Sequence, residues 1–381
     1  MKVILSRYFL YVFIGLEVLL LPVLLPRELY VEIEYNKFIL YFIPFLLFGA
    51  NSGYVYFKYN KNKDYFYSLI FFASIYFAVV ACIIYFLTSN FLFSLASFFI
   101  VIFMIMEQKV KTEKYFFLAM SIKPLISLSL LALASLTYYN LYSFNLDILY
   151  YAVLLAFCIW LLFVVILLKN KLIVDFNIKF KFYVKLIKKG FLINIGTLLL
   201  MVIFFTDRYF TKEYYNDYLA TYSFSYNLVQ FIIIALTTLA YVNVVEIGEK
   251  IKSLDILFLK QKLLYSYKIF GLLYVLFIGF IFIINDFYSF QDLVVISLLM
   301  GFFLGSFYSI NSLASVAIYK DLLPQVTQFL FLVMLINLLS SNILVNYEIN
   351  YIFFIIKSGI LLNAYSMYLI YVISRGVKVC Q

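Results

Sequence analysis

The sequence predicts an all-α integral membrane protein that crosses the bilayer about twelve times. Of its 381 residues, 66% are hydrophobic and only 13% are charged, whereas soluble globular domains are about half apolar and about a quarter charged. The apolar residues gather in continuous runs of about 20, the length that an α-helix needs to cross the hydrocarbon core. Because the strands of membrane β-barrels are about ten residues long and alternate between polar and apolar residues, these runs exclude a barrel.

Twelve such runs follow one another along the chain. They cover residues 3–25, 37–57, 65–87, 89–106, 115–138, 148–168, 190–209, 219–245, 264–284, 292–318, 324–345 and 349–374. The first run contains Arg7, Glu17 and Pro22 and is followed by no small-residue cleavage site. We therefore expect it to be a retained helix and not a signal peptide.

The distribution of lysine predicts the orientation in the membrane. The loops after even-numbered runs are basic; they hold Lys58, Lys61, Lys63, Lys109, Lys111, Lys114, Lys250, Lys252, Lys260, Lys262, Lys320 and the seven lysines of residues 169–189. The loops after odd-numbered runs hold only Arg27, Lys37 and Lys212. Since short basic loops stay in the cytoplasm, both termini are expected there. The net charge of +10 is then a topology signal that also attracts anionic membrane lipids, and no nucleic-acid partner is needed to explain it.

The chain divides at its longest hydrophilic stretch. In residues 169–189 lysines alternate with Phe, Ile and Val, which predicts a basic amphipathic linker on the cytoplasmic membrane surface. Six runs lie on each side, so we expect one six-helix bundle over residues 1–168 and a second over residues 190–381. Matching positions, such as Arg27 with Arg208 and Pro124 with Pro324, indicate that the bundles are related by a parallel pseudo-repeat.

Ionisable side chains within the runs are the candidate functional residues, because each costs about 3 kcal/mol or more in the bilayer. The candidate cations of a substrate-binding cavity are Arg7, Lys123, Arg208 and Lys357. Facing a shared cavity, they would bind an anionic headgroup such as a pyrophosphate through charge-assisted hydrogen bonds. Arg7 and Lys123 could instead extend to the membrane interface. Glu17 and Asp207 are candidates for coupling to a proton or sodium ion, with a structural ion pair as the alternative for Glu17.

The sequence excludes the usual equipment of an enzyme. It contains no His, and its three cysteines, Cys82, Cys158 and Cys380, lie far apart. We therefore predict no catalytic residue, no metal site and no disulfide framework. No glycine-rich phosphate-binding loop is present, so neither ATP nor another cofactor is expected. A gradient of Na⁺, H⁺ or the substrate remains as the energy source.

One stretch carries a family resemblance. Residues 190–246 read GFLINIGTLLLMVIFFTDRYFTKEYYNDYLATYSFSYNLVQFIIIALTTLAYVNVVE. Here an apolar helix ends in Asp207 and Arg208, a short loop follows, and the next helix contains Tyr222 and Ser223. The pattern resembles the start of the second half of bacterial O-antigen and capsule polysaccharide flippases. Residues 28–61 similarly resemble the first loop and second helix of that family.

The resemblance implies membership of the multidrug, oligosaccharidyl-lipid and polysaccharide exporter superfamily. Its members consist of two six-helix bundles around a central cavity and work by alternating access. The flippases move undecaprenyl-pyrophosphate-linked oligosaccharide repeat units across the bacterial inner membrane. The resemblance therefore implies a lipid-linked glycan as substrate, with a polysaccharide polymerase and chain-length proteins as partners.

Two other functions are weighed against the flippase. Cation-coupled drug antiporters of the same superfamily favour acidic cavities, and here only Glu17 and Asp207 are available, so the sign of the buried charge argues against them. A membrane polysaccharide polymerase needs a large outer loop, whereas the longest expected outer loop has about 11 residues. A lipid-linked oligosaccharide flippase is the favoured prediction.

Overall fold

The structure is a computed structural model that describes residues 2–61, 63–139, 145–168, 178–249, 255–288, 290–319 and 322–378. All regular secondary structure in these ranges is helical. Among the described residues, eight helices are long and apolar enough to cross a membrane, or ten if each of two bent helix pairs is one span. Two shorter apolar helices, Phe9–Leu24 and Ile122–Tyr138, lie in the first and fifth predicted runs. Every predicted run therefore contains an apolar helix, and the all-α multi-pass class is confirmed.

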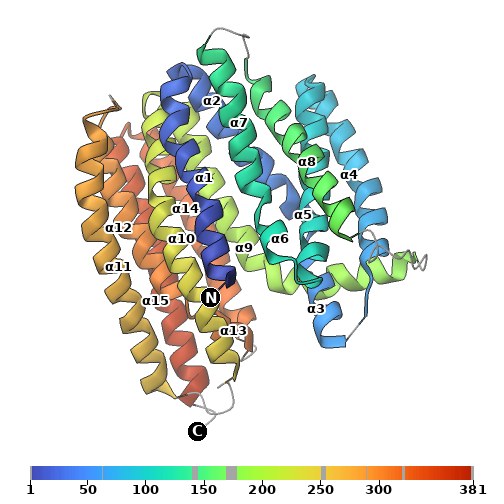
Figure 1. The fold of residues 1–381 in the computed structure, drawn as a ribbon. Helices are drawn as coiled ribbons and strands as arrows, with labels where there is room; N and C mark the ends of the chain where they lie inside the picture. The colour runs from blue at the N-terminus through green and yellow to red at the C-terminus, as the bar shows by residue number, and fades with distance from the viewer. Residues whose placement is uncertain are drawn as a thin grey trace. The chain divides into compact units, whose positions relative to one another are not determined.

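The helices pack into two compact units, residues Met1–Ile195 and Gly196–Gln381, called here the first and second units. Figure 1 labels their helices. The first unit contains α1 (Lys2–Leu24), α2 (Arg27–Phe42), the 3₁₀ helix η1 (Ile43–Leu47), α3 (Ala50–Lys61), α4 (Phe66–Thr88), α5 (Phe91–Thr112), α6 (Phe116–Met120), α7 (Ile122–Tyr138), α8 (Asp147–Leu168) and the first part of α9 (Phe180–Tyr214).

The second unit begins within α9. It continues with the 3₁₀ helix η2 (Asn216–Tyr218), α10 (Leu219–Glu249), α11 (Ile256–Asn285), α12 (Leu293–Asn311), α13 (Ala314–Tyr319), α14 (Leu323–Asn346) and α15 (Tyr351–Lys378). Near its start, Tyr215 donates a hydrogen bond to the carbonyl of Ile349 at 2.8 Å, and the rings of Tyr218 and Tyr351 stack at 4.7 Å. These contacts fix the end of α9 against the start of α15.

The two units repeat one packing order. In the first unit α4 packs on α5, α5 on α8 and α8 on α7. In the second unit α11 packs on α12, α12 on α15 and α15 on α14. These are the third and fourth, fourth and sixth, and sixth and fifth spans of each unit, in the same chain direction. The parallel pseudo-repeat is therefore present in the helix packing.

The second span differs from the straight helix predicted over residues 37–57. The expected outer loop before it is helical, because α2 begins directly after Pro26. The span then breaks at Phe48 and Gly49, which have φ angles of 48° and 82°, and its two parts meet at 56°. Pro44 at the start of η1 lacks the amide proton that a continuing α-helix would use.

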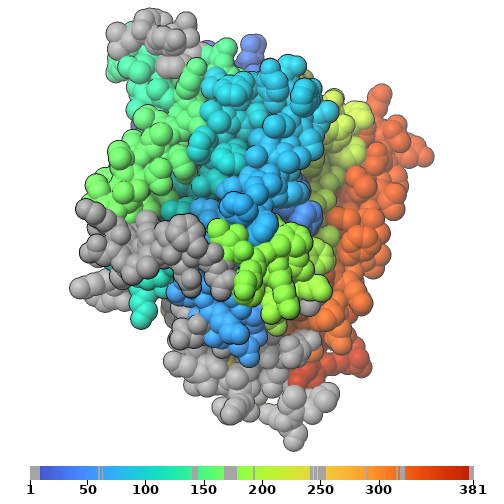
Figure 2. Space-filling view, turned by 90° about the vertical axis from the view of Figure 1, so that its right-hand side faces the viewer, coloured from blue at the N-terminus to red at the C-terminus, as the bar shows by residue number. Residues whose placement is uncertain are grey.

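The predicted interfacial linker is seen in part. Residues 169–177 lie outside the described residues, whereas residues 180–191 form the first part of α9. Figures 1 and 2 show this part lying across one end of α4. The amide of Lys179 donates to Ser68 Oγ at 3.1 Å, and the rings of Tyr65 and Phe182 stack at 4.4 Å. The linker's described half is therefore packed within the first unit.

Candidate functional site

Four buried side chains of the first unit form one ionic network, called here the acidic cluster: Glu17, Glu34, Lys37 and Ser127. The Nζ of Lys37 lies 2.5 Å from Glu17 Oε1 and 3.1 Å from Glu34 Oε1. Ser127 donates a hydrogen bond to the second oxygen of Glu17 at 2.5 Å. Both carboxylates share one ammonium group, so the ionised cluster carries a net charge of −1.

Three helices bring the acidic cluster together. Glu17 comes from α1, Glu34 and Lys37 from α2 and Ser127 from α7, and α1 packs along α7. Residues three apart on a helix lie on the same face, which lets Lys37 reach Glu34 within its own helix. The carboxylates are only 2% and 3% exposed. At such burial an unpaired charge is costly, so this arrangement requires the lysine.

A second network lies in the second unit and is called here the basic cluster: Asp207, Arg208, Asn337, Ser341 and Lys357. Asp207 Oδ1 lies 3.4 Å from Lys357 Nζ and accepts a hydrogen bond from Asn337 Nδ2 at 3.1 Å. Lys357 also donates to Ser341 Oγ at 2.6 Å. The sequence predicted Asp207 and Lys357 as separate candidates, and the structure joins them as an ion pair between α9 and α15.

Arg208 is held away from that ion pair by aromatic rings of α10. Its guanidinium carbon lies 5.0 Å from the ring centre of Tyr226 and 5.8 Å from that of Tyr222. Adjacent helical residues point about 100° apart, which explains why Asp207 faces α15 while Arg208 faces α10. The ionised cluster has two cations and one carboxylate, so its net charge is +1.

A small cavity adjoins the basic cluster. Its volume is about 30 Å³, and Asp207, Tyr222, Tyr226 and Ser358 lie in its wall among apolar residues. Both rings that face Arg208 therefore also line the cavity. Water or a small polar group fits there, whereas a whole lipid headgroup requires more space than this cavity has.

The other predicted cations lie elsewhere. Lys123 on α7 is exposed, and its ammonium lies 5.2 Å from the ring centre of Tyr41. Lys268, which the sequence also shows within a run, is exposed on α11. The side chain of Arg7 lies outside the described residues. Of the four predicted cavity cations, the structure brings Arg208 and Lys357 into one cluster.

Five members of the two clusters are not predicted from the sequence: Glu34, Lys37, Ser127, Asn337 and Ser341. Glu34 and Lys37 lie where the sequence predicts an outer loop and the start of the second span, although their spacing of three is typical of a helical pair. The other three are uncharged polar residues in apolar helices, which carry little signal alone. Within the described ranges, no group of three or more Cys, Asp or Glu is arranged to hold a metal ion.

Two solved structures are similar to the whole chain. A structure described as MATE in the straight conformation matches with a TM-score of 0.62 at 15% identity, covering 99% of this chain and 95% of that one. A structure of MATE in complex with Br-NRF matches with a TM-score of 0.60 at 15% identity, covering 98% and 94%. The chain has the MATE fold. No protein-family model matches the sequence, and no curated protein is significantly similar to it.

The MATE fold agrees with the twelve apolar spans in two units described above. At 15% identity the likeness establishes the architecture alone.

Proposed function

We propose that the protein is a secondary transporter that moves a lipid-linked oligosaccharide from the cytoplasmic to the outer leaflet of a bacterial inner membrane. The observation that carries this proposal is the basic cluster. Arg208 is 3% exposed and the Lys357 side chain is 11% exposed, so two largely buried cations stand beside the single carboxylate of Asp207. A buried excess of positive charge favours an anionic substrate group such as the pyrophosphate of a polyprenyl carrier.

The chemistry of Arg208 suits this role. A guanidinium presents several donors in a fixed plane that matches phosphate oxygens, and it packs on aromatic rings with little loss of contact energy. Lys357 is held in place by Asp207 and Ser341, so a pyrophosphate would compete with Asp207 for its ammonium. We propose that this exchange of partners couples substrate binding to movement of α15.

The acidic cluster favours a second candidate, a cation-coupled drug antiporter. Its two carboxylates and single lysine leave one negative charge, which a proton or a cationic compound would neutralise. In the favoured proposal the same cluster serves a different purpose: Glu17 and Glu34 take up the coupling ion, H⁺ or Na⁺, while the basic cluster serves the substrate. Asp207, which is paired with Lys357, then takes part in substrate binding and not in ion coupling.

A gene-deletion strain tests the proposal. Undecaprenyl-linked oligosaccharide is measured on each face of the inner membrane, together with surface polysaccharide. Complete repeat units that accumulate on the cytoplasmic side, with surface polysaccharide lost, are the expected result.

Two other outcomes would contradict the flippase. Repeat units that reach the outer face but stay unpolymerised would indicate a polymerase. Unchanged glycolipids, combined with increased sensitivity to cationic drugs, would indicate the antiporter.

A further inference from the structure

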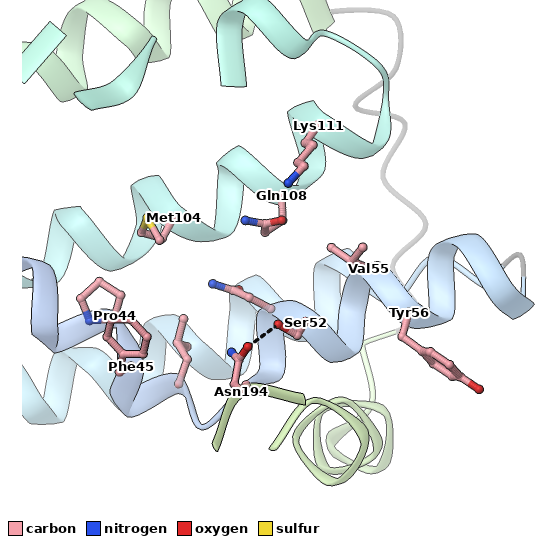
Figure 3. A pocket seen from close by; sticks show the side chains of 12 residues that line it. Pro44, Phe45, Ser52, Val55, Tyr56, Met104, Gln108, Lys111 and Asn194 are labelled. Carbon is pink, nitrogen blue, oxygen red and sulfur yellow. Dashed lines mark hydrogen bonds between the residues drawn. The ribbon is translucent and has the colours of Figure 1, made fainter. Parts of the chain in front are cut away.

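The first unit contains a cavity that neither charge cluster uses. Its volume is about 420 Å³, and residues of η1, α3, α5 and α9 line it. Binding pockets for small molecules commonly measure about 300–1,000 Å³. Figure 3 shows Gln108 and Lys111 on the α5 side of this cavity, with Ser52 and Asn194 on the other side. The size fits a sugar with one phosphate group.

Close backbone packing positions one wall of the cavity. A Cβ atom on Gly190 would lie 1.7 Å from the carbonyl oxygen of Gly49, and one on Gly53 would lie 2.0 Å from that of Leu186. Only glycine permits this approach of α3 to α9. As a result, Ser52 donates a hydrogen bond to Asn194 Oδ1 at 2.8 Å across the two helices.

The polar groups of the cavity have unused bonding capacity. Among the residues that the structure describes, Asn51 Oδ1 is buried and has no hydrogen-bond partner. Buried acceptors of this kind are rare and call for an explanation, and a ligand hydroxyl would supply the missing donor. Within the same residues Lys111 makes no ion pair closer than 4 Å; the charge acting on it from its own helix is Glu107, one turn earlier.

Lys111 differs in this respect from its neighbour Lys109. Lys109 is bonded to Asp64 at 2.8 Å and to Glu113 at 3.1 Å, so its charge is already neutralised within the protein. Lys111 lines the cavity instead. The cavity therefore combines one available cation with amide and hydroxyl groups that recognise hydroxyls, and with the ring of Phe45 at one end.

We propose that this cavity binds a glycosyl phosphate, with Lys111 on the phosphate and the amides of Asn51 and Gln108 on the sugar hydroxyls. The inference deepens the proposed function and rests on it for the lipid part of the ligand: the glycosyl phosphate is the headgroup of the polyprenyl-linked substrate as it enters, and the basic cluster binds the pyrophosphate at a later step of transport. The positive-inside prediction assigns this end of the unit, with Lys58, Lys109 and Lys111, to the cytoplasm. That is the side from which the substrate would enter.

Binding to the purified full-length protein in phosphatidylcholine nanodiscs tests the site. The probes are farnesyl-pyrophosphoryl-N-acetylglucosamine, farnesyl pyrophosphate and free N-acetylglucosamine 1-phosphate. We expect Lys111→Gln to weaken both farnesyl probes about 10- to 100-fold, because a charge-assisted hydrogen bond is lost. Gln108→Leu and Asn51→Leu should weaken only the probe that carries the sugar. Lys63→Gln, a matched loss of charge at an exposed loop position, should change nothing.

Gln108→Glu keeps the size of the side chain and adds a negative charge, so it should weaken both farnesyl probes even if the leucine variants fail to fold. Wild-type affinity in Lys111→Gln and Gln108→Glu, or no binding of any probe to the wild type, would overturn the site. If free N-acetylglucosamine 1-phosphate binds as tightly as farnesyl-pyrophosphoryl-N-acetylglucosamine, the ligand is not a lipid headgroup and that part of the proposal is overturned. If the gene-deletion strain shows no change in glycolipids while Lys111→Gln weakens probe binding, the flippase function is refuted and the binding site in the cavity is supported.

Discussion

The two units contain buried ionic clusters of opposite composition. In the first unit two carboxylates, Glu17 and Glu34, share the ammonium of Lys37. In the second unit two cations, Arg208 and Lys357, accompany the single carboxylate of Asp207. The acidic cluster thus has more carboxylates than cations and the basic cluster more cations than carboxylates, among apolar helices where a buried ion is expensive. The packing of the third to sixth spans repeats between the units, whereas the clusters lie on different spans: the first, second and fifth in the first unit, and the first, fifth and sixth in the second.

Under the proposed function, this difference in composition suits different ligands in the two units. An excess carboxylate attracts a proton or metal cation, whereas an excess guanidinium attracts an anion. A transporter that couples a cation gradient to an anionic substrate needs both kinds of site. Substitutions that change the charge of either cluster test this difference, and the largest loss of stability is expected at Lys37.

Lys37→Met should be the most destabilising change. It removes the cation that the two buried carboxylates share, at a cost of about 3–5 kcal/mol. The thermal unfolding midpoint of the purified protein in detergent is the measurement. Lys123→Met is the matched control, since Lys123 is exposed and its ammonium lies over the ring of Tyr41.

Glu34→Gln gives the opposite test of the same cluster. It leaves Glu17 and Lys37 as a balanced pair, so its unfolding midpoint should stay near that of the wild type. A Lys37→Met protein that is as stable as Glu34→Gln would show that the two carboxylates do not carry charge together.

Arg208→Ala should reduce transport while the protein stays folded. It removes the excess cation of the basic cluster but leaves Asp207 and Lys357 paired. We expect export of repeat units to fall at least about tenfold, the equivalent of one lost charge-assisted contact. Arg208→Lys should retain part of the activity because the charge is kept.

Lys357→Ala complements this variant, since it should also stop export while membrane insertion is preserved, with Lys357→Arg milder. Leaflet-resolved glycolipid analysis measures both sets. Wild-type export in Arg208→Ala would remove the basic cluster from the substrate pathway.

The sequence was sufficient to predict the spans and insufficient to predict the clusters. Continuous apolar runs locate membrane helices because the bilayer imposes a length and forbids unpaired backbone groups. The stretch containing Glu34 and Lys37 looked like a loop because of its charges. In the structure Lys37 bonds to Glu17 of α1, and Ser127 of α7 bonds to the other oxygen of Glu17. Such pairing depends on how neighbouring helices are rotated, and the sequence of one helix does not contain that information.

The same reasoning applies to the second unit. Asp207 and Lys357 could each be recognised from their depth in an apolar run. Their partners Asn337 and Ser341 could not, because single amides and hydroxyls are common in membrane helices and commonly bond to their own backbone. The break at Gly49 was also hidden, since it depends on the contact with Gly190.

Ser127→Ala should have a smaller effect than the charge variants. It removes the hydroxyl that donates to Glu17 but leaves the ion pair with Lys37, so we expect a loss of about 1–2 kcal/mol in unfolding free energy. If Glu17 binds the coupling ion, the variant should also shift the pH dependence of export. Ser135→Ala on the same helix is the control, because the Ser135 hydroxyl donates to the backbone carbonyl of Leu131. Equal effects of the two variants would contradict a special role for Ser127.

The smallest effect is expected outside the membrane spans, at Asp64 between α3 and α4. Burial opposes ionisation of this carboxyl, but hydrogen bonds from Lys109 and Lys58 outweigh it and lower its pKa. A lowered pKa in the folded state stabilises the protein above the unfolded pKa of about 3.9, and the stabilisation disappears as the pH falls through the folded value. Asp64 is about one-third exposed, so solvent screening should keep its contribution to stability below about 1 kcal/mol.

Asp64→Asn should therefore lower the unfolding midpoint slightly at pH 7, and the difference from wild type should vanish as the solution is acidified below about pH 4. Because both clusters of buried charge are intact in this variant, its export activity should be unchanged, whereas a loss of export would show that the contact of α3 with α5 takes part in the transport cycle.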